Sequence, residues 1–265
     1  MGCHPQITQW MFDSYYGEES LGFAYAQIGQ ENSFLRKKDQ VLEGLRVQIE
    51  QLKKRRDVTF QKMCDSGVWF KENYPITTPA TSVVALNNFD TADVQSVYYD
   101  CKNYTANLFR FEDRIFFRSL FLFDERIEDL YLKETCTTFD AIYENLPIVD
   151  TMTCPNETRT RSGLTIDGAT KPFGAEKIAE GVLAVGFENG AVTFYEDRIE
   201  IDAKSLWLDR KSVKADVTVE KNRLLFVYKN HIYCMEVGGA TLSENGEGIC
   251  FAATERTIVL RPRKG

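Results

Sequence analysis

The sequence predicts an α+β fold, in which a mixed helical and stranded region over residues 1–155 precedes an antiparallel β-sandwich over residues 172–265. Apolar residues recur at helical spacing before residue 75, and short strand-like runs alternate with turns after residue 172. The chain has 265 residues, of which 43% are hydrophobic, enough for a substantial core. This composition excludes a disordered or low-complexity chain.

The first 74 residues are predicted to be mainly helical. One apolar stripe repeats at alternating spacings of three and four residues and is formed by Leu42, Leu45, Ile49 and Leu52. The helical pattern resumes near Met63, and Pro75 ends it. The apolar run at 21–28 is too short for a confident helix and lies among glycines, which indicates a buried strand.

The stripe has two interpretations. It packs against its own domain, or it forms a seam between copies of the chain and makes a homo-oligomer. The pattern covers only about two heptads, whereas a sustained coiled coil needs three or four, and this favours packing within the chain. The homo-oligomer stays open as the alternative.

The rest of the chain is richer in strand signals. Extended runs are expected at 81–86, 96–99, 107–111 and 115–123, and a helix at 124–133. After residue 172, alternating apolar residues flank the dipeptide Asn189-Gly190, a strong hairpin signal. Further short strands without helices between them predict an antiparallel sandwich or barrel.

Charge and residue usage narrow the function classes. The formal net charge of −7 disfavours a nucleic-acid partner. No apolar run approaches the roughly 20 residues that span a bilayer, and residues 1–10 lack the features of a secretory signal, so no membrane partner is expected. Seven widely spaced cysteines without a C-x-x-C pair favour free thiols in a reducing, cytoplasmic setting. Because only His4 and His231 are present, neither a metal nor a cofactor is predicted.

Carboxylates are the main candidates for chemistry. Glu31 lies between the run at 21–28 and the next helix, where α/β barrels display catalytic groups; in the alternative interpretation it stabilises the helix N-terminus. Asp100 ends a predicted strand, although aspartate is also common in turns. A glycosidase needs two such carboxyls beside one sugar bond. Trp207, between Leu206 and Leu208, is either a sugar platform or a core residue.

Four segments carry a resemblance to a known family: WFKENYP at 69–75, TPATSV at 78–83, SVYYD at 96–100 with Tyr104, and ENLPIVD at 144–150. Together they resemble the later part of bacterial carbohydrate-active proteins of the polysaccharide-deacetylase-like or glycosidase-like barrel type, with a trailing β-domain. The resemblance implies a distorted (β/α) barrel acting on glycans, with part of an incomplete barrel in residues 1–155.

The chain departs from that family in two respects. It lacks the Asp-His-His metal set of the deacetylases. It is also too short for a complete barrel of roughly 250 residues together with a sandwich, so the resemblance implies the C-terminal part of a longer protein.

The predicted function is therefore a carbohydrate-active, glycoside hydrolase-like protein, or a C-terminal fragment of one. Its partner is carbohydrate, its acid/base candidates are Glu31 and Asp100, and its ligand contacts are Trp207 and Tyr104. One alternative is a non-catalytic module that binds glycan or protein through the β-domain. The other is a structural assembly subunit that pairs through the apolar stripe.

Overall fold

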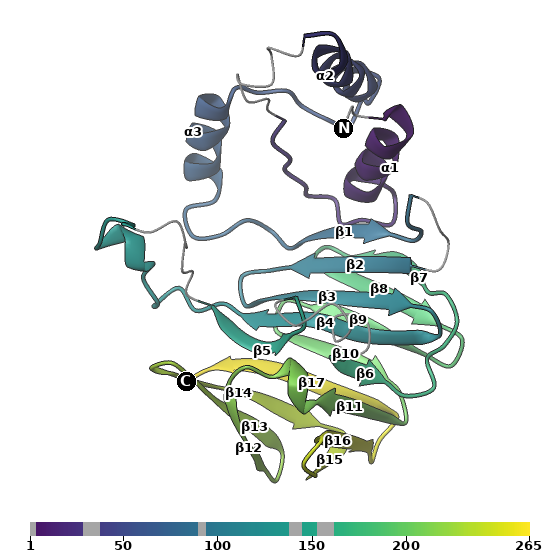
Figure 1. Ribbon diagram of the computed structural model, residues 1–265, viewed down its shortest axis with the longest axis vertical. Coiled ribbons are helices and arrows are strands. Elements are labelled where there is room, and N and C mark those ends of the chain that lie inside the picture. The colour runs from purple at the N-terminus through teal and green to yellow at the C-terminus, as the bar shows by residue number, and fades with distance from the viewer. Residues whose placement is uncertain (1–3, 29–37, 90–93, 138–144, 153–161) are drawn as a thin grey trace.

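The computed structural model describes residues 4–28, 38–89, 94–137, 145–152 and 162–265. In this part of the chain the protein is mostly antiparallel β-structure in two sheets, with three α-helices toward the N-terminus (Figure 1). The predicted α+β fold class is therefore confirmed as a combination of antiparallel sheets and a few helices.

The helices are α1 (Pro5–Tyr16), α2 (Lys38–Lys53) and α3 (Met63–Asn73). Pro5 suits the first turn of α1, where its missing N–H would have no helical partner. The Nδ1 atom of His4 accepts a hydrogen bond from the Gln6 N–H at 3.4 Å and caps this helix. α3 stops before Pro75, because proline disfavours helical backbone in the residue that precedes it. Both predicted helices, at the stripe and near Met63, are confirmed.

Sheet A has nine strands in the described residues, in the order β1-β2-β3-β4-β6-β11-β16-β15, with β5 paired to β4. Their bounds are β1 (Thr81–Ala85), β2 (Val94–Asp100), β3 (Tyr104–Phe111), β4 (Arg114–Leu122), β5 (Leu146–Asp150), β6 (Leu164–Ile166), β11 (Ser205–Asp209), β15 (Ala240–Glu244) and β16 (Gly248–Ala253). This sheet joins strands from both sides of the predicted 155–172 boundary, and the division into two domains stays a prediction.

Sheet B has eight strands in the described residues, in the order β12-β13-β14-β17-β10-β9-β8-β7. Their bounds are β7 (Gly174–Ala179), β8 (Val182–Phe187), β9 (Gly190–Tyr195), β10 (Arg198–Asp202), β12 (Asp216–Glu220), β13 (Arg223–Tyr228), β14 (His231–Gly238) and β17 (Thr257–Lys264). Short 3₁₀ helices lie at Leu130–Leu132 and Arg210–Ser212.

One hydrophobic core lies between the two sheets. Because side chains alternate between the faces of a strand, every second residue of β2 and β9 enters it. Tyr99 of β2 and Phe194 of β9 are both 0% exposed, and their rings stack with centroids 5.2 Å apart. The face of sheet A turned away from this core is called the outer face below.

The hairpin predicted at Asn189-Gly190 is present as β8 and β9, but its turn lies one residue earlier. Phe187 pairs with Gly190, so Glu188 and Asn189 form the connection. Gly190 is required for a different reason: a Cβ atom there would lie 1.9 Å from the carbonyl oxygen of Asp202 on β10. The glycine permits a close approach of two strands rather than the turn itself.

Two expectations about strands are wrong. Every strand pair among the described residues is antiparallel, so the (β/α) barrel implied by the resemblance, which needs parallel strands, is not formed there. Residues 21–28 are extended but join no sheet ladder, and most of them are exposed rather than buried. Their links to sheet A go through side chains, as described below.

The helix expected at 124–133 is also wrong. These residues form turns and the short 3₁₀ helix, because the Asp124 carboxylate accepts from the Arg126 backbone N–H at 3.1 Å and from its guanidinium. A side chain that bonds to the backbone two residues ahead favours a turn over a helix.

Candidate functional site

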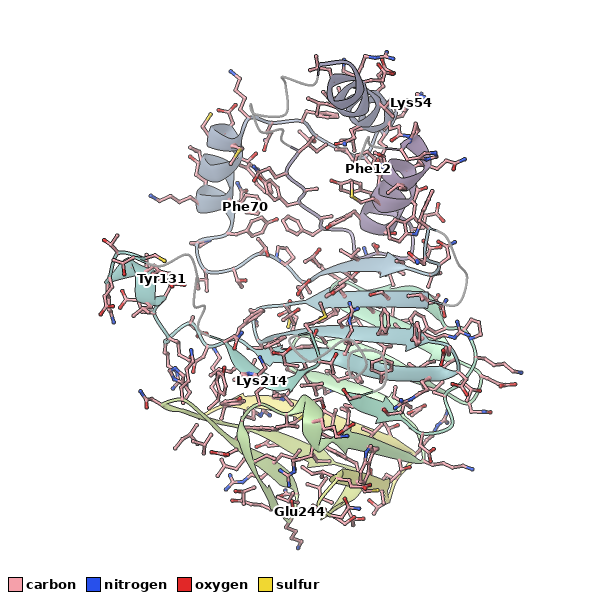
Figure 2. All side chains as sticks on the ribbon, in the orientation of Figure 1. Phe12, Lys54, Phe70, Tyr131, Lys214 and Glu244 are labelled. Atoms are coloured by element: carbon pink, nitrogen blue, oxygen red, sulfur yellow. The ribbon has the colours of Figure 1, made fainter. Side chains whose placement is uncertain are left out.

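A cleft of about 600 Å³ lies between the outer face of β1 and β2 and the N-terminal segments. Figure 1 shows residues 21–28 as an extended stretch between α1 and α3, and Figure 2 labels Phe70 on α3 beside it. Five aromatic side chains and one carboxylate line the cleft, which we call the aromatic cleft: Tyr15, Phe23, Tyr25, Phe70, Tyr98 and Asp100.

Two hydrogen bonds fasten the extended stretch to sheet A. The Thr81 hydroxyl donates to the carbonyl of Phe23 at 2.6 Å. The backbone N–H of Leu21 donates to the Ser82 hydroxyl at 2.8 Å. Since Leu21 is only 4% exposed, this end of the stretch is anchored in the core, while Tyr25 further along is 50% exposed. The stretch therefore forms a wall of the cleft with aromatic side chains available to solvent.

Edge-on aromatic contacts hold α3 against the same stretch. The Phe23 and Tyr74 rings lie 5.5 Å apart, and the Tyr25 and Phe70 rings lie 5.1 Å apart at 88°. Such T-shaped pairs are the preferred geometry of aromatic rings and contribute about 0.5–1.5 kcal/mol each beyond area burial. The cleft walls are thus positioned by ring packing as well as by hydrogen bonds.

Asp100 supplies the carboxylate of the cleft. It is the last residue of β2 on the outer face, and it is half-buried. Burial raises its pKa, although the hydroxyl of Thr105 on the neighbouring strand donates to the carboxylate and opposes the shift. A carboxyl with a raised pKa among aromatic rings can accept a hydrogen bond when ionised and donate a proton when neutral.

The structure does not bring the four predicted site residues together. Asp100 lines the cleft, and Glu31 lies outside the described residues. Tyr104 is 0% exposed, and its hydroxyl donates to the carbonyl of Tyr195 at 2.6 Å between the two sheets. Its side chain has no surface to offer a ligand in this structure.

Trp207 is half-buried on the outer face, packed over Gly248 so closely that a Cβ there would lie 2.5 Å from its ring. β11, which carries it, is four strands from β2, or about 19 Å at ordinary strand spacing. It therefore belongs to a different part of the outer face from Asp100.

The aromatic residues of the cleft were missed at the sequence level. Phe23 and Tyr25 do alternate in the run at 21–28, which is the pattern of one exposed face, and Phe70 lies in the segment 69–75. These side chains meet only because the chain folds back on β1. Neither the alternation in residues 21–28 nor the segment 69–75 indicates that fold-back.

A second cavity of about 650 Å³ lies at the ends of the strands, among the turns near 189–191, 202–204 and 253–256. Its described lining contains no aromatic side chain, and Arg256 approaches Asp202 at 3.4 Å with 90% of its side chain exposed. Ion pairs this exposed contribute little. Its apolar surface comes from small residues such as alanine rather than from the larger apolar and aromatic side chains that typically line a ligand site.

The apolar stripe of α2 is divided between interior and surface. Leu52 is 3% exposed and Leu45 is half-buried, whereas Leu42 and Ile49 are 46% and 37% exposed. The rest of the chain packs against only part of the stripe. The stripe is therefore neither completely buried within the domain nor a fully exposed seam. The homo-oligomer stays a prediction.

Three further features bear on the site. Over the described ranges, no three His, Cys, Asp or Glu side chains gather to hold a metal ion. No helix found there is long and apolar enough to cross a membrane. The thiols of Cys64, Cys101, Cys234 and Cys250 are free, and burial raises the pKa of Cys101 to about 11, which leaves it a weak nucleophile.

Comparison of the chain with protein-family models, with curated proteins and with solved structures finds no match in any of the three. The functional argument therefore rests on the geometry of the aromatic cleft.

Proposed function

We propose that the protein is a glycan-binding module, in which the two sheets form a β-sandwich and the aromatic cleft holds a neutral sugar chain. The observation that carries the proposal is the combination of five aromatic side chains with one carboxylate in a single cleft. Ligand sites are typically lined by apolar and aromatic side chains with a few polar groups that orient the ligand. Sugar rings suit such a lining because their C–H faces pack on aromatic rings while their hydroxyls bond to polar groups.

The charge of the cleft supports a neutral ligand. Asp100 is the one charged side chain among the described lining residues, and the whole chain carries −7. Nucleic-acid binding depends on cations that neutralise phosphates. A phosphate-rich ligand would meet a carboxylate here, whereas a sugar hydroxyl can donate to it.

Glycoside hydrolysis is the second candidate, favoured by the raised pKa of Asp100 in an aromatic environment, which suits a general acid. Hydrolysis needs a second carboxyl about 5–9.5 Å away. The described lining contributes only Asp100, so binding without turnover is the better supported function. Glu31 stays the sequence-predicted partner carboxyl for this candidate.

Calorimetric titration of the whole chain with tetrasaccharides of glucose, xylose, mannose and N-acetylglucosamine tests the proposal. We expect at least one to bind, and Tyr25→Ala to weaken it about tenfold, which corresponds to about 1.4 kcal/mol. Phe60→Ala is the matched control, because Phe60 is 53% exposed and does not line the cleft, whereas Tyr25 is 50% exposed and does.

Each outcome separates the candidates. Binding that Tyr25→Ala weakens and Phe60→Ala does not supports the module. Turnover of a chromogenic glycoside that is lost in Asp100→Asn favours the hydrolase instead. Absence of binding to all four sugars, or equal losses in both aromatic variants, overturns the proposed cleft.

A further inference from the structure

A chain of polar contacts runs across the outer face of sheet A and ends at the cleft. Asn107 on β3 is 0% exposed, and its amide nitrogen donates to the Val97 carbonyl at 3.1 Å and to the Ser96 hydroxyl at 2.9 Å. These bonds leave its Oδ1 atom to accept from Arg118 Nε on β4 at 2.8 Å. The orientation of the arginine is therefore set by a buried amide.

Arg118 is held from a second side and reaches toward the cleft. Its guanidinium lies over the Phe109 ring, 4.3 Å from the centroid. Its Nη2 atom donates to the hydroxyl of Tyr98 at 3.0 Å, and Tyr98 lines the cleft. Arg118 itself is not among the lining residues, so any influence on a ligand passes through Tyr98.

The hydrogen bond from Arg118 determines whether the Tyr98 hydroxyl can donate or accept toward a ligand. A phenol has one proton to donate and lone pairs that accept. Because a cationic donor occupies a lone pair, the phenolic proton remains for a partner, and no acceptor for it is found in the described part of the chain. Asp100, two residues along the same face of β2, can only accept when ionised.

We infer that Arg118 is a positioning residue that makes Tyr98 a hydrogen-bond donor beside the acceptor Asp100, so that the cleft selects polyhydroxylated neutral rings over uronic acids. This inference rests on the proposed glycan-binding function. A neutral ring offers hydroxyls that can accept from Tyr98 and donate to Asp100. A uronate would bring its charge beside the carboxylate of Asp100, whereas the guanidinium of Arg118 lies outside the lining and is already engaged by Asn107 and Tyr98.

A double-mutant cycle tests whether Arg118 acts through Tyr98. The neutral tetrasaccharide that binds the wild type best is titrated into Arg118→Met, Tyr98→Phe and the double variant. We expect each single variant to weaken binding about fivefold, and the double variant to be no weaker than Tyr98→Phe alone. Arg114→Met is the matched control, because Arg114 lies on the same strand and stacks over Phe116 at 5.8 Å, away from the cleft residues.

The specificity is measured with an oligogalacturonate of the same length. We expect wild type to bind it at least tenfold more weakly than the neutral sugar, and Asp100→Asn to reduce that preference. Losses that add in the double variant, or an equal loss in Arg114→Met, overturn the role of Arg118. Equal affinity for neutral and acidic sugars overturns the specificity. If the wild type binds no neutral sugar, the proposed function fails and this inference fails with it.

Discussion

The Thr81 hydroxyl donates to the carbonyl of Phe23 at 2.6 Å, and this bond joins sheet A to the stretch that forms the other wall of the aromatic cleft. It is one of the two polar links described for that stretch, which has no ladder pairing of its own. The shape of the cleft therefore depends on side-chain contacts across 58 residues of chain.

The first prediction concerns this bond. Thr81→Val keeps the shape of the side chain but removes the donor, and we expect it to lower the free energy of unfolding by about 1 kcal/mol. Thr78→Val is the control, since Thr78 also lines the cleft and its hydroxyl has no hydrogen bond among the residues described. Urea unfolding of both variants measures the difference. Equal effects of the two substitutions would show that the bond contributes nothing.

Asp100 is predicted to cost stability at neutral pH. Burial raises its pKa above the ordinary 3.8, so the folded state binds the proton more tightly than the unfolded state. The contribution of Asp100 to the free energy of unfolding is then fully present below pH 3.8, where the carboxyl is protonated. It is lost as the pH rises through the raised pKa and the carboxyl ionises. Asp100→Asn stays neutral and can still accept from Thr105, so we expect it to be more stable than wild type at pH 7.

Unfolding free energies measured from pH 3 to pH 8 test whether ionisation of Asp100 destabilises the fold. The advantage of Asp100→Asn should shrink toward zero as the pH falls, whereas exposed Asp216→Asn should show no such trend. A variant that is less stable than wild type at pH 7 would refute the assignment. A carboxylate retained at a cost to stability is typical of a functional group.

Tyr104 is predicted to act on stability alone. Its hydroxyl lies 2.6 Å from the Tyr195 carbonyl and 3.1 Å from that of Arg198, so Tyr104→Phe should cost about 1–3 kcal/mol by leaving buried carbonyls without their donor. The ring stays stacked on Tyr99, and sugar affinity should stay within twofold. Exposed Tyr25→Phe is the control for stability. Weaker binding without loss of stability would restore Tyr104 as a ligand contact.

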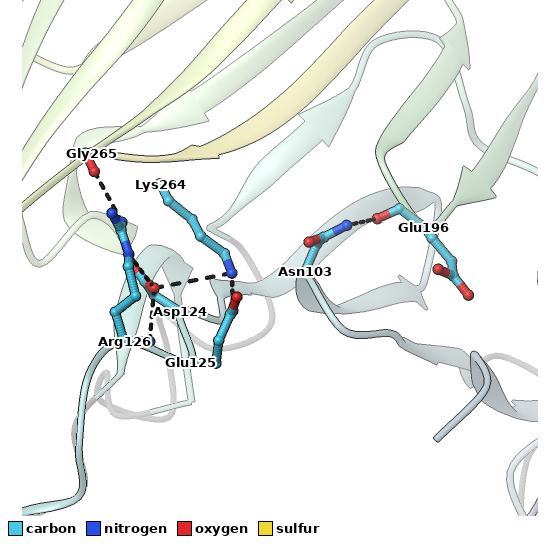
Figure 3. A network of polar contacts seen from close by, with 7 residues as sticks. All are labelled: Asn103, Asp124, Glu125, Arg126, Glu196, Lys264 and Gly265. Carbon is cyan, nitrogen blue, oxygen red and sulfur yellow. Dashed lines mark hydrogen bonds and ion pairs between the residues drawn. The ribbon is translucent and has the colours of Figure 1, made fainter. Parts of the chain in front are cut away.

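The fourth prediction concerns the polar network in Figure 3. The Asp124 side chain is 7% exposed, and hydrogen bonds from Arg126 hold its pKa below the ordinary 3.8 despite some burial; Lys264 lies 4.0 Å away. A lowered carboxyl pKa stabilises the fold above pH 3.8, and this contribution is lost as the pH falls through the folded-state value.

We therefore expect Asp124→Asn to be less stable than wild type at pH 7, with a deficit that shrinks in acid. The opposite slopes of the Asp100 and Asp124 variants make each an internal check on the other. A deficit in Asp124→Asn that persists unchanged at pH 2 would show that the carboxylate charge is not what stabilises this network.

The sequence predicted much of sheet B, because its strands are short, alternate regularly and are separated by polar turns. It did not predict β5, whose five residues are all buried but include Pro147, nor β6, which has three residues within a polar segment. These strands are fixed by pairing with β4, which lies well before them in the chain. The alternation within a strand indicates which of its residues face the core, but not which distant strand it pairs with.

Only part of the site could be predicted in the same way. Asp100 stood out because it ends a predicted strand, and β2 does end at this residue, but nothing near it in sequence indicates the rings around it. Tyr15, Tyr25 and Phe70 come from three separate N-terminal segments. Their meeting depends on tertiary contacts such as the bond from Thr81 to Phe23.

The most direct test of the central claim is a map of amide chemical-shift changes when the best-binding neutral tetrasaccharide is added to the whole chain. The account predicts changes at 23–25, 70, 78–83 and 98–100, which surround the aromatic cleft. The amides at 189–191 and 202–204, around the second cavity, should not move. Changes confined to that cavity or to Trp207, or no saturable change, would contradict a glycan site in the aromatic cleft.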